Sequence, residues 1–171
     1  MVRTIVVACF VLLLAIPAMA QEDYPKVQTS MGYANLNLLS ARHSGFANQT
    51  SFNLSRTWGL DNYMGIYGLG QGVTLISDFF GGKAMYRGAK VVPYGLAGIG
   101  VGYFSSQSQG YVSASSAFAT RVGVGFDVPI NDSMAWKVEV SRMGFHIQTT
   151  ANSGWTNGTN ISAGIVFTLS N

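Results

Sequence analysis

Residues 118–128 read FATRVGVGFDV, and their side chains alternate between two kinds. The even positions are mostly apolar, whereas the odd positions are small or charged and include Arg121 and Asp127. Successive side chains of a β-strand point to opposite faces of the sheet. The stretch therefore predicts a strand with one apolar face and one polar face. Its length of roughly ten residues is that of a tilted strand crossing a lipid bilayer.

Two later segments repeat this alternation. From Met134 the apolar positions are Met134, Trp136, Val138 and Val140, and they alternate with Ala135, Lys137, Glu139 and Ser141. Near the end of the chain the apolar positions are Ile161, Ala163, Ile165, Phe167 and Leu169, and they alternate mostly with small or polar residues. Three neighbouring strands with the same two-faced pattern predict a sheet with lipid on one side.

Five weaker segments lie upstream of residue 118. We expect strands over 26–38, 49–56, 62–70, 81–87 and 92–104, the first with a change of face near Asn35. The last of these is rich in alternating glycine, which leaves room for close packing on one face. With the three later segments, the total is eight strands.

The predicted connections alternate in length. Short links are expected over 57–61, 88–91 and 129–133, and longer polar loops over 39–48, 71–80, 105–116 and 147–159. A sheet in lipid must pair all of its backbone polar groups, and only a closed barrel leaves no free edge. The fold class expected is therefore all-β, an eight-stranded antiparallel up-and-down transmembrane β-barrel. Short turns and both termini should face the periplasm.

The N-terminus has the pattern of an export signal. Arg3 precedes an apolar run of about twelve residues, and Ala18-Met19-Ala20 forms a small-x-small cleavage box. A membrane-spanning helix is the alternative, but it needs about 20 apolar residues. We therefore expect a signal peptide over 1–20 and a barrel domain over 21–171. The lone cysteine, Cys9, lies within the signal, so disulfides, zinc–cysteine sites and thiol nucleophiles are excluded from the barrel domain.

Charge is scarce in this chain. Only 10% of the residues are charged and 21 are glycine, whereas soluble domains are about 25% charged. The sequence has no cluster of lysine and arginine, so nucleic acid is not an expected partner.

Four charged residues fall on the polar faces of neighbouring strands, namely Arg121, Asp127, Lys137 and Glu139. This lumen polar cluster could line a pathway for a small solute. Alternatively, its members could form ion pairs with one another and plug the barrel, which is the interpretation we favour. An eight-stranded barrel has an interior filled by side chains.

Aromatic residues collect near the predicted short turns. Trp58, Tyr63, Tyr94 and Trp136 are expected to form a periplasmic aromatic girdle at the membrane surface.

No catalytic, cofactor or metal site is expected. The two histidines, His43 and His146, lie in or near predicted loops and lack further ligands at a defined spacing. Ser141, Glu139 and His146 are close in sequence, but no nucleophile-elbow pattern surrounds the serine. The glycines of 95–102 have the spacing G-x-x-G-x-G-x-G, which is not that of a dinucleotide-binding loop.

Three segments carry a family resemblance: PYGLAGIGVGYF at 93–104, FATRVGVGFDVPINDSMAWKVEV at 118–140 and NISAGIVFTLS at 160–170. They resemble the bacterial outer-membrane β-barrel domain family, whose small eight-stranded members are similar in architecture to outer-membrane protein A and to opacity proteins. The resemblance covers the second half of the chain well and the first half in layout. It implies export to the bacterial outer membrane, with outer-membrane lipid and the barrel-assembly machinery as partners, and it leaves the partner of the extracellular loops unknown.

Three functions fit these observations. The first is a structural or surface-interaction barrel without catalysis, which we favour. The second is a narrow porin-like channel for small solutes, which requires a polar lumen along its whole length. The third is a secreted, soluble, lipocalin-like ligand carrier, which requires a charged exterior and an apolar interior.

Overall fold

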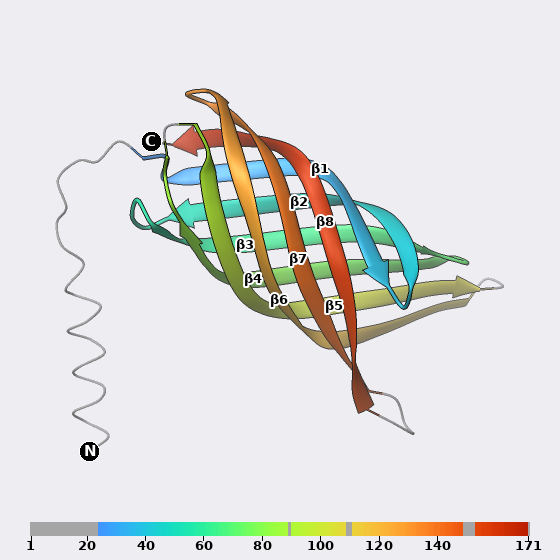
Figure 1. Cartoon of the computed structure of the whole chain (residues 1–171). Coiled ribbons are helices and arrows are strands. Elements are labelled where there is room, and N and C mark those ends of the chain that lie inside the picture. The colour runs from blue at the N-terminus through green and yellow to red at the C-terminus, as the bar shows by residue number, and fades with distance from the viewer. Residues whose placement is uncertain (1–23, 89, 109–110, 149–152, 171) are drawn as a thin grey trace, which may run out of the picture.

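The described part of the chain is a closed eight-stranded antiparallel barrel, which confirms the expected fold class (Figure 1). The computed structural model describes residues 24–88, 90–108, 111–148 and 153–170. The predicted signal peptide therefore lies outside the described residues. The strands are β1 (Val27–Leu38), β2 (Ala41–Asn53), β3 (Trp58–Gly70), β4 (Val73–Met85), β5 (Val92–Ser108), β6 (Tyr111–Asn131), β7 (Met134–Gln148) and β8 (Ser153–Ser170).

Each strand pairs with its neighbours in sequence, and β8 closes the ring against β1. Within the described residues no helix is long and apolar enough to cross a membrane. Both ends of the barrel chain lie at the same end of the molecule, where the Lys26 amide donates to the Ser170 carbonyl at 2.7 Å (Figure 1). We call this the turn end, and the opposite end the hairpin end.

Alternation in the sequence sets the two faces of the sheet as predicted for β6, β7 and β8. On β6, Val122 and Val124 point outward and are 58% and 65% exposed, whereas Arg121 points inward and is 3% exposed. The same division holds for Trp136 against Glu139 on β7. The outer surface of these strands is therefore apolar.

The strands are tilted, as the register of the pairs demonstrates. A line of paired residues that starts at Val27 on β1 passes once round the barrel and returns to β1 at Asn37, ten residues nearer the hairpin end. Between these two it runs through Phe52, Leu60, Gly82, Ala97, Val122, Arg142 and Thr159. Such a stagger is what closure of a tilted sheet requires.

The predicted long loops over 39–48 and 71–80 are wrong. β1 and β2 are joined by Leu39 and Ser40 alone, and β3 and β4 by Gln71 and Gly72. Leu39, Ser40 and Gln71 have φ angles of 52°, 65° and 52°, the left-handed conformation of tight hairpin turns. Most of 105–116 and 147–159 is strand too. These segments read as loops because polar residues fall on both faces of their strands and obscure the alternation.

The predicted change of face near Asn35 is also wrong. Even-numbered residues of β1 point inward along the described strand, and Ala34, Leu36 and Leu38 are buried inside the barrel. The pattern appeared to switch because the interior itself changes from polar to apolar toward the hairpin end.

The interior consequently has two zones. Toward the hairpin end lies an apolar cluster formed by Ala34, Leu36, Leu38, Ala47, Tyr63, Tyr67, Leu75, Phe79, Ala117, Ala119, Met143 and Phe145. Nearer the turn end lie buried charged side chains from β3, β4, β6 and β7. A smaller apolar cluster of Met85, Tyr94 and Leu96 lies beside these charges.

Candidate functional site

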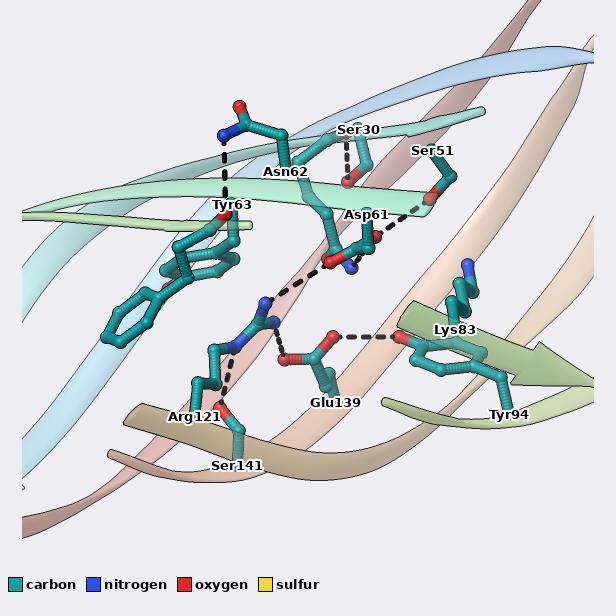
Figure 2. Close-up of polar contacts among 12 residues, drawn as sticks. Ser30, Ser51, Asp61, Asn62, Tyr63, Lys83, Tyr94, Arg121, Glu139 and Ser141 are labelled. Carbon is teal, nitrogen blue, oxygen red and sulfur yellow. Dashed lines mark hydrogen bonds and ion pairs between the residues drawn. The ribbon is translucent and has the colours of Figure 1, made fainter. Parts of the chain in front are cut away.

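Arg121 on β6 lies at the centre of the polar zone, and its side chain contacts residues of two other strands, β3 and β7 (Figure 2). Its Nη1 lies 3.3 Å from Oδ2 of Asp61 on β3, and its Nη2 donates to Oε1 of Glu139 on β7. Its Nε donates to Oγ of Ser141 at 3.5 Å. A buried guanidinium needs such paired acceptors, because an uncompensated charge in the interior costs several kcal/mol.

The two carboxylates around Arg121 are held by further hydrogen bonds. Oδ1 of Asp61 accepts from Gln49 Nε2 at 2.7 Å and from Ser51 Oγ at 2.9 Å. Oε2 of Glu139 accepts from the Tyr94 hydroxyl at 3.1 Å. Each carboxylate therefore has partners on both of its oxygens, which fixes its orientation.

A second group of charges lies nearer the turn end. Lys83 on β4 and Lys137 on β7 lie 3.6 and 4.0 Å from the two oxygens of Asp127 on β6. Lys137 also lies 3.9 Å from Oε2 of Glu139, which joins the two groups. Together they contain three cations and three anions, none more than 6% exposed, so the interior network is electrically neutral. Arg121, Asp127, Lys137 and Glu139 thus meet inside the barrel.

Tyr63 and Tyr94 line this network, so their assignment to an outward-facing girdle is wrong. The Arg121 guanidinium lies 3.8 Å from the centre of the Tyr63 ring, and Lys83 Nζ lies 4.0 Å from the Tyr94 ring. Both tyrosines are buried. Trp58 and Tyr63 are five residues apart on one strand, an odd separation, so they cannot share a face.

Trp58 and Trp136 do point outward and are exposed. Trp58 begins β3 and Trp136 is the third residue of β7, so both lie near the turn end. Tyr86, which follows β4, is exposed near the same end.

A neutral hydrogen-bonded triangle separates the charges from the apolar zone. The hydroxyls of Tyr63 and Tyr67 are 2.6 Å apart, and both contact the side-chain amide of Asn160 on β8, at 3.1 and 3.0 Å. These three side chains are buried. The triangle therefore satisfies its own polar atoms without water.

The rest of the lumen is filled. Phe79, Phe104 and Phe145 pack edge to face or tilted across the hairpin end, with ring centres 5.7 to 6.4 Å apart. Cavities beside Asp61 and Arg121, and beside Lys83 and Asp127, have a volume of about 10 Å³ each. Such a space holds at most about one water molecule.

Arg87, which follows β4, is a further cation at the turn end. Burial lowers the pKa of its guanidinium, and the charge of Asp127 opposes that shift. The guanidinium lies 5.9 Å from the Tyr24 ring.

The structure does not bring Ser141, Glu139 and His146 together as a catalytic site. Ser141 and Glu139 point inward and both contact Arg121. His146 lies on the outer side of β7, where its ring lies 5.3 Å from that of Trp155. His43 lies on β2, which β7 does not adjoin. Among the described residues no group of three or more His, Cys, Asp or Glu could hold a metal ion.

Sequence reasoning missed two of the network's six charges, Asp61 and Lys83. Asp61 was assigned to a turn, and Lys83 to a strand without a role, because the upstream strands alternate less clearly. A usable signal was present: Asp61, Tyr63, Gly65 and Tyr67 share one parity on β3, and an aspartate within an apolar strand belongs on the inner face.

Comparison with known proteins places this geometry among membrane barrels. The sequence matches the family model described as outer membrane protein beta-barrel domain over residues 6–167. A comparison with curated proteins finds no match. Neisserial surface protein A has a similar structure, with a TM-score of 0.65 and 14% identity over 84% of this chain and 96% of that chain.

Two further solved structures are similar. A de novo designed transmembrane β-barrel has a TM-score of 0.55 and 15% identity over 86% of this chain and 98% of its own. The N-terminal β-barrel domain of OprF from Pseudomonas aeruginosa has a TM-score of 0.53 and 13% identity over 82% of this chain and 97% of that chain. At these identities the similarity concerns the fold alone.

Proposed function

The chain belongs to the outer membrane protein beta-barrel domain family, and on that premise we propose that it is a non-conducting barrel with a structural or surface-interaction role. Proteins of this family are located in the bacterial outer membrane. The single observation that carries the proposal is the filled interior, in which a neutral charge network and an apolar zone follow one another along the barrel.

A porin-like role has less support, because it requires a wet polar path from one end to the other. Arg121, Asp61 and Glu139 bridge the lumen, and beyond them Leu36, Leu75 and Phe145 are fully buried. An ion passing that apolar zone would lose its hydration without a replacement.

A soluble carrier has less support for the opposite reason. Its exterior would have to be polar, whereas the exposed residues of β5 to β8 include Ile99, Val122, Val124, Trp136 and Ile161. Such a surface favours contact with outer-membrane lipid, which we propose as the partner of this face.

The hairpins support a role at the cell surface. β5 and β6 contain 17 and 21 residues, although about ten suffice to cross the bilayer. These two strands extend from the hairpin end in Figure 1. We propose that the hairpin end is extracellular and that its protruding strands meet other molecules, with no catalysis.

Export and assembly follow from the same proposal. Residues 1–20 would act as a cleaved signal peptide, and the barrel-assembly machinery would insert the remaining chain. N-terminal sequencing of the outer-membrane form tests the cleavage, with Gln21 expected as the first residue.

The lumen is tested by electrical recording. The chain is purified from outer membranes, its folded state is verified by a gel shift that depends on boiling, and it is inserted into planar lipid bilayers beside a general porin as the positive control. We expect no conductance steps and no swelling of solute-loaded liposomes. Reproducible steps from the folded barrel would contradict the proposal and favour the channel.

The orientation is tested with an epitope tag. A tag placed after Gln71, in the turn between β3 and β4, should be reached by antibody on intact cells. The matched control carries the tag after Asp132, in the turn between β6 and β7, and should be labelled only after permeabilisation. The reverse pattern would contradict an extracellular hairpin end.

A further inference from the structure

Two charged side chains lie on the outer face of the barrel beside apolar residues of their own strands. Asp78 on β4 is exposed between Ile76 and Phe80, the adjacent outward residues of its strand. Arg142 on β7 is exposed and follows the outward residues Trp136, Val138 and Val140. Charges on the lipid-facing side of a barrel are destabilising unless they find partners.

The two charges lie at the same height along the barrel axis. A line of paired residues climbs ten residues over eight strand-to-strand steps, from Val27 to Asn37. Asp78 is three steps from Met31, through Asn48 and Met64. Arg142 is six steps from Val27 on the line given above. Each step thus climbs about 1.25 residues, so three steps from residue 31 and six steps from residue 27 reach the same height. Both charges therefore lie level with residues 34–35 of β1.

Each charge is hydrogen-bonded within its own barrel, but no counter-ion is found for it in the part of the chain that the structure describes. Asp78 Oδ1 accepts from Asn62 Nδ2 at 2.9 Å, and Arg142 Nη1 donates to Thr159 Oγ1 at 3.1 Å. No ion pair joins either of them to another described residue. They cannot pair with each other within one barrel, because β5 and β6 lie between their strands.

We propose that Asp78 of one copy pairs with Arg142 of a second copy, so that the β4 face of one barrel binds the β7 face of the next in the plane of the membrane. Copies inserted by the same route share their orientation and depth, so equal height is the geometric condition for this contact. The charges are opposite and each has polar atoms to spare. The apolar residues beside them, Phe80 and Val140, come to equal depth as well.

The contact joins two different faces, so it is heterologous. A heterologous contact can add further copies at both ends and makes rings or rows instead of a closed pair. A twofold-symmetric dimer formed through the β4 face would instead place Asp78 against Asp78, which like charges disfavour.

The experiment uses cysteine crosslinking of the full chain in outer membranes. Residues 21–171 contain no cysteine, so Cys9→Ser gives a cysteine-free background. Two differently tagged copies are co-expressed, one with Phe80→Cys and the other with Val140→Cys, and oxidised in isolated membranes. We expect a mixed Phe80→Cys with Val140→Cys crosslink that exceeds both crosslinks between identical variants.

Charge variants then test the ion pair. Asp78→Arg should lower the mixed crosslink by about threefold to tenfold, and Asp78→Arg combined with Arg142→Asp in every copy should restore it. Asp78→Asn is the milder second variant and should also lower the crosslink. Each variant is first shown to be folded by its boiling-dependent gel shift.

Three results would overturn the proposal. The mixed crosslink could be no stronger than those between identical variants. It could survive both Asp78→Asn and Arg142→Gln, which would mean that the two charges face lipid headgroups and water. Finally, the swapped pair could fail to restore a crosslink that Asp78→Arg had removed, which would exclude direct pairing.

Discussion

Arg121 on β6 and Asp61 on β3 form an ion pair across the barrel, with 3.3 Å between Nη1 and Oδ2, although 60 residues separate them in the sequence. The pair spans the lumen, and Glu139 holds the same guanidinium from β7. It also ties together strands that are not neighbours in the sheet. The network therefore braces the barrel's cross-section, and it is the basis of the proposed non-conducting role.

Arg121→Met should destabilise the barrel strongly. The change keeps much of the side-chain volume but leaves Asp61 and Glu139 as buried charges without their cation. Breaking a buried pair in this way costs about 3–5 kcal/mol. Equilibrium urea unfolding in detergent micelles, followed by tryptophan fluorescence, measures the loss.

Arg42→Met is the matched control, because Arg42 is exposed near the hairpin end. Its unfolding free energy should change by less than about 0.5 kcal/mol. Adding Asp61→Leu and Glu139→Leu to Arg121→Met should recover part of the loss. Equal stability of Arg121→Met and the wild type would show that the network adds nothing to folding.

The neutral triangle gives a second prediction. Tyr63→Phe removes one hydroxyl and leaves Tyr67 and Asn160 each short of a buried hydrogen-bond partner. The expected loss is about 1–3 kcal/mol in unfolding free energy, measured by the same urea titration. Tyr103→Phe, at an exposed tyrosine on the outer face, is the control and should be near neutral. Similar effects at the two sites would argue against a structural role for the triangle.

The sequence predicted the second half of the barrel better than the first, for a physical reason. In β6 to β8 the outer face is almost uniformly apolar, so alternation separates it from the inner face. In β1 to β4 the outer face includes Thr29, Asn48, Thr50, Asn62 and Asp78, and the inner face includes Leu36, Tyr67 and Leu75. Polarity there does not distinguish inside from outside.

The composition of the candidate site was predictable only in part. Arg121, Asp127, Lys137 and Glu139 lie on neighbouring strands, so local alternation brings them together. Asp61 and Lys83 reach them across the lumen, and that contact depends on the stagger of the closed sheet. The stagger can be calculated only from the pairing registers of the strands. The registers cannot be derived from strand boundaries that are wrong by several residues, as they are for the strand predicted at 49–56.

The turn between β1 and β2 gives a third prediction. Leu39 and Ser40 both have positive φ angles, which asparagine and glycine adopt more easily than leucine and serine. Leu39→Asn with Ser40→Gly should therefore raise the unfolding free energy by up to about 1 kcal/mol. The urea midpoint should rise with an unchanged slope.

Leu39→Ala is the control for this turn. It removes the same exposed apolar side chain without favouring a positive φ angle, so it should not stabilise the barrel. If alanine stabilised as much as the asparagine–glycine pair, the gain would come from the lost apolar exposure and not from the turn conformation.

The three tryptophans allow the membrane position of the barrel to be measured. Trp58 and Trp136 lie outward near the turn end, and Trp155 lies outward toward the hairpin end, packed on Phe118 with ring centres 6.2 Å apart. Following the register, Trp155 is about 11 residues higher than Trp136 and about 12 higher than Trp58, or about 28–31 Å for strands tilted by about 40°. This separation is enough to place the two groups of tryptophans at opposite edges of an apolar band of about 25 Å.

Variants that keep one tryptophan each, with phenylalanine at the other two positions, are placed in vesicles whose lipids carry bromine either near the headgroup or near the chain end. All three should be quenched more by the shallow bromines, because indole rings settle at the membrane interface. Stronger quenching of Trp58 or Trp136 by the deep bromines would show that the turn end sits within the hydrocarbon, and the barrel would then have to be shifted along its axis in the membrane.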